Sequence, residues 1–135
     1  MDKILLIDDD RSSRLVLKHL LEKMGFIVIQ SANGRHGWET LSENNDIGFI
    51  ITDMMMPDMD GRELIQLIRK DEDQQKVPVI IISGCFNPED IKPILDISPE
   101  RTFFMNKPLK REILDKYLNI ISSLKLNEPQ SSIAG

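Results

Sequence analysis

Short apolar runs alternate along this chain with stretches in which apolar residues recur at helical spacing. The runs are rich in β-branched and aromatic residues, which favour buried strands. They cover residues 3–7, 26–29, 47–53, 77–82 and 102–105. Five such alternations predict a doubly wound α/β domain with a five-stranded parallel sheet and five helices. Right-handed crossovers would bring the carboxyl ends of all five strands to one edge of that sheet.

The helices that this pattern predicts differ in strength. The first should end at Gly25, since glycine suits the position just after a helix. The second, around Trp38 and Leu41, is expected to be weaker and to break at Gly37. A third helix after Gly61 has a well-defined apolar face. Its inward-facing positions are expected to be Leu64, Ile65, Leu67 and Ile68.

The last two helices set the C-terminal limit of the domain. Pro88 suits a first helical turn, but Pro93 follows soon after, so the fourth helix should be short or irregular. The fifth helix is expected to carry one apolar face, formed by Leu109, Ile113, Tyr117, Ile120 and Ile121. We therefore predict one domain over residues 1–124, with residues 125–135 as a flexible C-terminal tail or the start of a linker.

Composition and charge narrow the possible functions. The chain has 135 residues, of which 41% are hydrophobic and 29% charged, as in a globular domain. Its net charge of −5 argues against direct nucleic acid binding. No apolar run approaches the roughly 20 residues that span a bilayer, so no membrane association is expected. The single cysteine, Cys85, excludes an internal disulfide and favours a reducing compartment, which makes the cytoplasm the expected location.

Charged and polar residues stand where four of the expected strands end. Asp8 and Asp9 follow the first strand, and Asp53 ends the third. Ser83 follows the fourth strand, and Lys107 stands just beyond the fifth. Each has an ordinary explanation as well, because aspartates cap helices, serines occur in turns and lysines occupy surfaces. That these residue types stand at four strand ends by accident is nevertheless the weaker interpretation, because ligands bind at this edge of open α/β sheets.

These residue types together indicate phosphoryl-transfer chemistry. Three neighbouring carboxylates repel one another unless a cation lies among them. Oxygen ligands without histidine or cysteine select a hard ion, and Mg²⁺ suits a small open acidic site that also takes phosphate. A carboxylate can itself act as a nucleophile and form an aspartyl phosphate. A hydroxyl and a lysine ammonium can then donate to the oxygens of the transferring phosphoryl group.

Four motifs resemble those of the receiver domains of two-component response regulators. They are Leu5-Leu6-Ile7-Asp8-Asp9-Asp10, Asp53-Met54-Met55-Met56-Pro57-Asp58-Met59-Asp60-Gly61, Ile82-Ser83-Gly84 and Lys107-Pro108. The resemblance implies a flavodoxin-like fold with strand order 2-1-3-4-5. It also implies a switch that controls a partner or output domain of unknown identity. Such a domain catalyses its own phosphorylation and dephosphorylation only, and is not otherwise an enzyme.

The resemblance further assigns roles in phosphorylation and metal binding. Asp53 would accept a phosphoryl group from a phosphohistidine on a sensor histidine kinase or a histidine phosphotransfer protein. Asp9 would bind Mg²⁺ directly and Asp8 largely through water. Asp53 and the backbone carbonyl of Met55 would complete the protein ligands, and Mn²⁺ is expected to substitute for Mg²⁺.

Other implied roles concern the response to phosphorylation. Ser83 would follow the phosphoryl group and Lys107 would pair with it. Phe104 stands at the position of the family's aromatic switch residue, where it lacks the hydroxyl of a tyrosine. The peptide bond between Lys107 and Pro108 is expected to be cis.

Two further positions predict a slow loss of the phosphoryl group. In receiver domains, the residues two after the phosphoacceptor and two after the Ser or Thr help to position the hydrolytic water. Met55 and Cys85 occupy these positions here. Neither a thioether nor a thiol orients water well, and the bulk of Met55 could also shield the phosphoryl group.

One enzymatic alternative is a haloacid-dehalogenase-like phosphatase with Asp8 as its nucleophile. That family also has an Asp-x-Asp motif after its first strand, then a Ser or Thr, and then a Lys, and Asp8, Ser83 and Lys107 satisfy this order. Against it, no convincing acidic pair follows the lysine, and the chain leaves little room for a cap. The motif that begins at Asp53 would also have no explanation. A degenerate receiver that only binds partners is disfavoured because every expected site residue is present.

Overall fold

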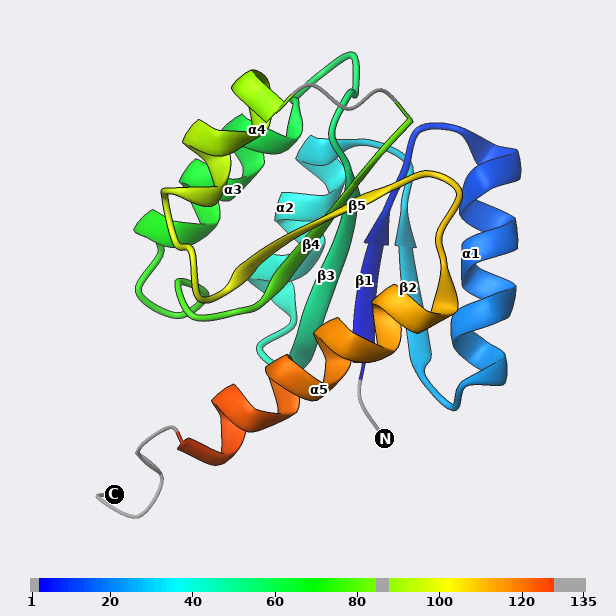
Figure 1. The fold of residues 1–135 in the computed structure, drawn as a ribbon. Helices are drawn as coiled ribbons and strands as arrows, with labels where there is room; N and C mark the ends of the chain where they lie inside the picture. The colour runs from blue at the N-terminus through cyan, green and yellow to red at the C-terminus, as the bar shows by residue number, and fades with distance from the viewer. Residues whose placement is uncertain (1–2, 85–87, 128–135) are drawn as a thin grey trace.

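The computed structural model describes residues 3–84 and 88–127, which form a parallel sheet with helices on both faces (Figure 1). The strands are β1 (Lys3–Ile7), β2 (Ile27–Ser31), β3 (Ile47–Asp53), β4 (Val79–Ser83) and β5 (Thr102–Asn106). Their order across the sheet is β2-β1-β3-β4-β5, and every neighbouring pair is parallel. The predicted doubly wound, flavodoxin-like topology is therefore confirmed.

Within residues 3–84 and 88–127, five helices connect or follow the strands. They are α1 (Arg11–Lys23), α2 (Gly34–Glu43), α3 (Gly61–Lys70), α4 (Pro88–Leu95) and α5 (Arg111–Asn127). Gly25 lies just after the end of α1 with φ of 96°, a left-handed conformation that glycine adopts without strain, as predicted. Helix α4 has eight residues and contains Pro93, which confirms the prediction of a short fourth helix.

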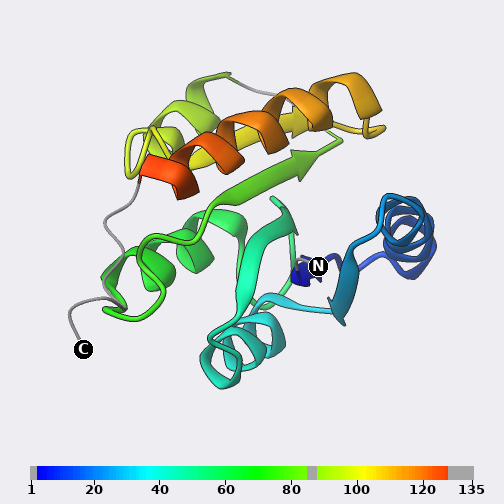
Figure 2. The same ribbon diagram turned by 90° about the horizontal axis from the view of Figure 1, so that it is seen from below.

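The sheet separates two hydrophobic cores. Ile4 and Leu6 of β1 point to the face covered by α1 and α5, whereas Leu5 and Ile7 point to the face covered by α2, α3 and α4. In the view of Figure 1, α5 crosses in front of the sheet and α2 lies behind it, and Figure 2 shows the same layers from below. Each of these side chains is fully buried, which stabilises the fold by about 1.5–3 kcal/mol per residue. Strand β1 is therefore an interior strand, packed on both faces, that supports the residues following it.

Helix α2 differs from the prediction, because it continues through Gly37 without a break. A Cβ atom added at Gly37 would lie 2.4 Å from Cδ1 of Ile7, so only glycine lets this helix approach β1 so closely. Tertiary packing here outweighs the low helix propensity of glycine. The predicted break at Gly37 is wrong, and the residue is a contact between α2 and β1.

Two apolar positions expected to face inward are exposed instead. Leu67 of α3 is 37% exposed and Ile120 of α5 is 45% exposed, because each lies at the margin of the buried stripe of its helix. Helix α5 also continues to Asn127, past the predicted domain limit at residue 124. Residues 128–135, within the predicted tail, lie outside the described residues. Among the described helices, none is both long and apolar enough to cross a membrane.

Candidate functional site

Three aspartates come together at the carboxyl ends of β1 and β3, and these strand ends lie at the upper edge of the sheet in Figure 1. Ile7 pairs with Thr52 in the parallel register, so Asp8 and Asp53 extend from adjacent strands. One carboxylate oxygen from each of Asp8, Asp9 and Asp53 lies within 4.8 Å of the others. This is the convergence that the sequence predicted for these three residues.

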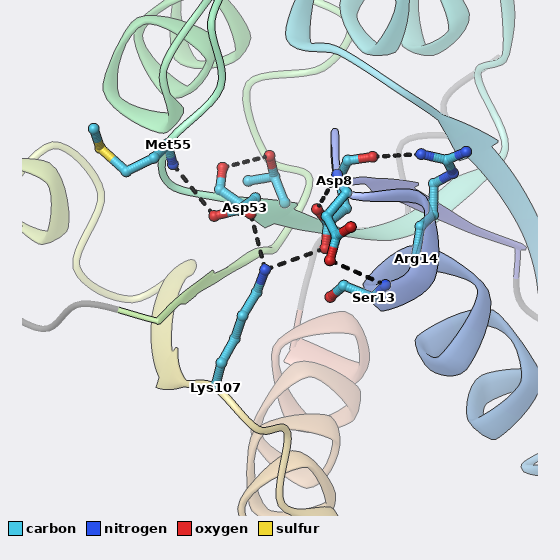
Figure 3. A network of polar contacts seen from close by, with 8 residues as sticks. Asp8, Ser13, Arg14, Asp53, Met55 and Lys107 are labelled. Atoms are coloured by element: carbon cyan, nitrogen blue, oxygen red, sulfur yellow. Dashed lines mark hydrogen bonds and ion pairs between the residues drawn. The ribbon is translucent and has the colours of Figure 1, made fainter.

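Lys107 joins two of these carboxylates from the loop after β5. Its Nζ lies 2.9 Å from Oδ2 of Asp53 and 3.3 Å from Oδ2 of Asp8 (Figure 3). The backbone N–H of Lys107 donates to the carbonyl of Ser83 at 2.8 Å, which fixes the start of this loop against the end of β4. The peptide bond between Lys107 and Pro108 is cis. The ends of β1, β3, β4 and β5 are thus connected through one lysine.

The site contains more negative charge than its lysine neutralises. Burial raises the pKa of the Asp53 carboxyl, and the hydrogen bonds from Lys107 and Met55 and the charge of Lys107 offset this only in part, while the charge of Asp8 adds to the rise. Burial alone would lower the pKa of the Lys107 ammonium, but the hydrogen bond and charge of Asp53, together with Asp8, outweigh it and raise that pKa. In a simple ion pair the pKa of the acid would fall. At Asp53 it rises instead, because burial outweighs the effect of the lysine.

Asp8 is held rigidly at the centre of the site. Its side chain is almost fully buried, and its Oδ1 accepts from the backbone N–H of Asp10 at 2.9 Å. Its own N–H donates to the Ser31 carbonyl at 3.1 Å, and its carbonyl accepts from Nη1 of Arg14 at 2.7 Å. Asp9, by contrast, is exposed. The pair therefore offers one fixed carboxylate and one that is accessible to solvent.

Asp10, and not Asp8 or Asp9, caps the first helix. Its Oδ2 accepts from the backbone N–H of Ser13 at 3.3 Å, which leaves the two preceding carboxylates for the site. The ordinary explanation of Asp8 and Asp9 as helix caps is therefore wrong. Arg14, which binds the Asp8 carbonyl from α1, was not predicted, because an arginine on a helix surface carries no distinguishing signal in the sequence.

The loop between β3 and α3 encloses the other side of Asp53. The N–H of Met55 donates to Oδ1 of Asp53 at 3.3 Å, and the N–H of Gly61 donates to the carbonyl of Met54 at 2.8 Å. The side chain of Met55 is 68% exposed and extends away from the Asp53 carboxylate in Figure 3. In this conformation, the thioether does not cover the carboxylate. Cys85, the other residue on which slow phosphate loss was predicted, lies outside the described residues.

Ser83 and Phe104, the expected switch residues, occupy adjacent strands. Ser83 ends β4, is 3% exposed and pairs in register with Asn106 of β5. Phe104 is partly buried in β5, and its carbonyl accepts a hydrogen bond from the hydroxyl of Tyr117 in α5. Tyr117 was predicted only as an apolar contact of the last helix. Its hydroxyl joins α5 to the backbone of the switch position.

The three aspartates fit a hard divalent cation. They offer only oxygen atoms, which suits Mg²⁺ and Mn²⁺ and not a softer metal. Three carboxylates with oxygens this close repel one another unless a cation lies among them. The backbone carbonyl of Met55, two residues after Asp53, belongs to the same loop and could add a fourth oxygen.

Comparisons with known proteins identify the family. The chain matches the response regulator receiver domain over residues 4–119. It is 28% identical over 120 residues to the chemotaxis protein CheY1 of Helicobacter pylori, which covers 88% of this chain and 95% of the relative. A solved response regulator receiver domain protein from Clostridium thermocellum has a TM-score of 0.80 and 30% identity, with 95% of this chain and 100% of that chain covered. This chain belongs to the response regulator receiver domain family.

A further relative shows that this domain also occurs in longer proteins. The 3',5'-cyclic-nucleotide phosphodiesterase regA of Dictyostelium discoideum is 32% identical over 121 residues, which cover 88% of this chain but 15% of regA. The family match over residues 4–119 confirms the resemblance to receiver domains on which the predicted signalling function was based. It does not favour the alternative of a haloacid-dehalogenase-like phosphatase with Asp8 as nucleophile, because the matched family is the receiver domain.

Proposed function

We propose that Asp53 accepts a phosphoryl group from a phosphohistidine, in a site that binds Mg²⁺ through Asp8, Asp9, Asp53 and the Met55 carbonyl. The observation that carries this proposal is the position of Lys107, whose ammonium contacts both Asp53 and Asp8 within the cluster of three carboxylates. A lysine that only paired with one surface acid would not join the buried carboxylate of Asp8 to that of Asp53, which follow different strands.

In the proposed reaction, a carboxylate oxygen of Asp53 attacks the phosphorus of the phosphohistidine. The new O–P bond forms as the P–N bond breaks, and the electron pair of that bond leaves with the imidazole of the donor. Bound Mg²⁺ would neutralise charge on the phosphoryl oxygens. The Lys107 ammonium and the Ser83 hydroxyl are the protein's own donors to these oxygens. The same groups would serve hydrolysis of the aspartyl phosphate, so the domain acts only on its own phosphorylation state.

The proposed output is a change of conformation around Ser83 and Phe104. Ser83 would move with the phosphoryl group, and Phe104 would change its packing on β5. The phosphodonor would be a sensor histidine kinase or a histidine phosphotransfer protein, and a downstream protein would recognise the altered surface. We expect these events in the cytoplasm, where such kinases present their phosphohistidines.

Phosphorylation by acetyl phosphate tests the proposal directly. With Mg²⁺, the protein should gain one phosphoryl group that is labile as an acyl phosphate, measured by intact-protein mass spectrometry. Asp53→Asn should reduce this gain at least about 100-fold, because the amide is not a nucleophile. Chelation of Mg²⁺ should suppress it in the wild type.

Asp8→Asn is the matched variant that separates the two candidate nucleophiles. This variant should bind Mg²⁺ more weakly and be labelled more slowly, but the phosphoryl group should still be on Asp53. Undiminished labelling of Asp53→Asn, or a label that maps to Asp8, would contradict the proposal.

A further inference from the structure

The N-terminus of α2 is capped by residues from two distant parts of the chain. Asn33 accepts from the N–H of His36 at 2.8 Å, as an ordinary cap does. The two preceding N–H groups bind Asp58 of the β3–α3 loop: Gly34 donates to Oδ1 at 3.2 Å and Arg35 donates to Oδ2 at 2.9 Å. Asp58 thereby ties the loop that follows Asp53 to another helix.

Close packing reinforces this connection. A Cβ atom added at Gly34 would lie 2.9 Å from Cβ of Met59 and 3.0 Å from its carbonyl oxygen. The loop and the first turn of α2 are therefore in direct contact, with no room for a side chain between them. Although a small loss of solvent opposes it, backbone N–H groups, those of Arg35 and Gly34 foremost, lower the pKa of the exposed Asp58, so the carboxylate is ionised at neutral pH.

Helix α2 is itself fixed to β1 close to Asp8. Gly37 packs on Ile7, the residue that immediately precedes Asp8. Ser31 adds a polar link, since its carbonyl accepts from the N–H of Asp8 and its hydroxyl lies 2.8 Å from Nδ1 of His36. The first turn of α2 thus contacts the support of Asp8 on one side and the loop of Met55 on the other.

We infer that Asp58 is a positioning residue for the cation site, a role that rests on the function proposed above. The loop is fixed at its ends, where Met54 donates to Ile82 at 3.0 Å and Gly61 donates to Met54. Between these points Asp58 fastens it to α2, three residues after the Met55 carbonyl that would bind the cation. Without the Asp58 carboxylate, the loop is no longer held at a fixed distance from β1. The Met55 carbonyl, which would be the fourth oxygen ligand, is then no longer held in position.

Mg²⁺ binding to the unphosphorylated protein, measured by isothermal titration calorimetry, tests this role without any phosphodonor. Asp58→Ala should raise the Kd for Mg²⁺ about 5- to 10-fold, at the lower end of the effect of outer partners of metal ligands. Labelling by acetyl phosphate should recover to near the wild-type rate at saturating Mg²⁺. Asp58→Asn keeps one carbonyl oxygen for the N–H groups and should lose roughly half as much affinity on a logarithmic scale.

Asp60→Asn is the matched control for charge. It removes one negative charge from the same loop but retains the cap on Glu63, since asparagine caps as well as aspartate. Its Kd for Mg²⁺ should stay within about twofold of the wild-type value. An equal loss of affinity in Asp60→Asn and Asp58→Ala would show a general charge effect and overturn the inference, as would an unchanged Kd in Asp58→Ala.

The remaining outcomes separate this inference from the proposed function. If Asp58→Ala does not fold, as judged by its unfolding transition, the Asp58→Asn titration decides, and an unchanged Kd there overturns the positioning role. If Asp53 is labelled normally in the presence of Mg²⁺ but changes at Asp58 do not alter the Kd for Mg²⁺, only the inference about Asp58 is overturned. A wild-type protein that binds no Mg²⁺ removes the proposed metal site and this inference with it.

Discussion

A partly buried charged group lies at the amino ends of the strands and another at their carboxyl ends, and the two have opposite surroundings. At the amino ends of β4 and β5, the guanidinium of Arg69 donates to the carbonyls of Gln75, Val77 and Arg101 and to Oγ1 of Thr102. These acceptors are neutral and mostly backbone atoms. At the carboxyl ends, Lys107 faces carboxylates that outnumber it.

The difference separates a structural charge from a reactive site. Burial, and to a smaller extent the charge of Arg101, lowers the pKa of Arg69 to about 10, so the residue stays charged at neutral pH with four fixed acceptors. Only its Nε is buried without a hydrogen-bond partner. The carboxyl edge has the reverse balance, because one lysine faces a cluster of three carboxylates. Such a surplus is unfavourable in the protein alone and becomes favourable when a cation and a phosphoryl group bind.

The largest expected effect on stability follows from the Arg69 edge. Arg69→Met keeps a long apolar stem but removes the guanidinium donors to the carbonyls of Gln75 and Val77, while the Arg101 carbonyl keeps the N–H of Val79. We expect the free energy of unfolding to fall by about 2–4 kcal/mol, measured by urea denaturation. The Kd for Mg²⁺ should not change, because the affected edge lies at the opposite ends of the strands.

Arg101→Met is the control for this first prediction. Its Nη1 donates to the carbonyl of Lys76 at an exposed position, so its loss should cost less than about 1 kcal/mol. Equal destabilisation by the two variants would show that Arg69 is not a special support of this edge.

The next effect concerns Lys107 at the carboxyl edge. Lys107→Met should slow phosphorylation by acetyl phosphate about 100-fold, the usual effect of one lost donor to a charged transition state. The same change should strengthen Mg²⁺ binding, because it removes a positive charge from beside Asp53 and Asp8. A slower phosphorylation together with a higher affinity for Mg²⁺ distinguishes a donor to the phosphoryl group from a lysine that only forms a structural ion pair.

Lys110→Met is the matched control, since it removes an equal charge from an exposed position nearby. It should change neither the labelling rate nor the Kd for Mg²⁺ by more than about twofold. Weaker Mg²⁺ binding in Lys107→Met would contradict the surplus of negative charge at this edge.

The convergence at the carboxyl edge was predictable because a parallel sheet orders its strand ends by rule. Once the strands around Asp8, Asp53 and Lys107 were assigned, right-handed crossovers placed these residues together. The supports of the site were not predictable in this way. Arg14 and Asp58 are common residue types on a helix and a loop, and their partners are set by how these segments approach other parts of the chain.

The errors in the fold have the same origin. Gly37 reads as a helix breaker, yet close contact with Ile7 makes glycine the residue that fits. Leu67 and Ile120 read as core positions, because spacing predicts the direction of a helical face but not its width. Local propensity therefore predicted which elements form, and contacts between distant segments decided their details.

The smallest expected effect tests the raised pKa of Asp53 through pH. The pKa of Asp53 is raised in the folded protein, mainly by burial, so the folded state binds this proton more tightly than the unfolded state. The resulting stabilisation is fully present below the unfolded pKa of about 4 and is lost as the pH rises through the raised folded pKa. Relative to the wild type, Asp53→Asn should therefore gain stability as the pH rises, reaching about 1 kcal/mol near neutral pH without metal.

Mg²⁺ should reverse this order of stability, so that the wild type becomes more stable than Asp53→Asn, and this sharpens the test. At roughly ten times its Kd, the ion should stabilise the wild type by about 1.4 kcal/mol through linkage. It should stabilise Asp53→Asn and Asp9→Asn less, because each lacks one of the three carboxylates that lie within 4.8 Å of one another. The measurement is the free energy of unfolding in urea at several pH values, with Mg²⁺ and with a chelator. Equal Mg²⁺-induced stabilisation of all three proteins, or a metal-free Asp53→Asn that is less stable than the wild type at neutral pH, would show that these carboxylates do not repel one another and do not share a cation.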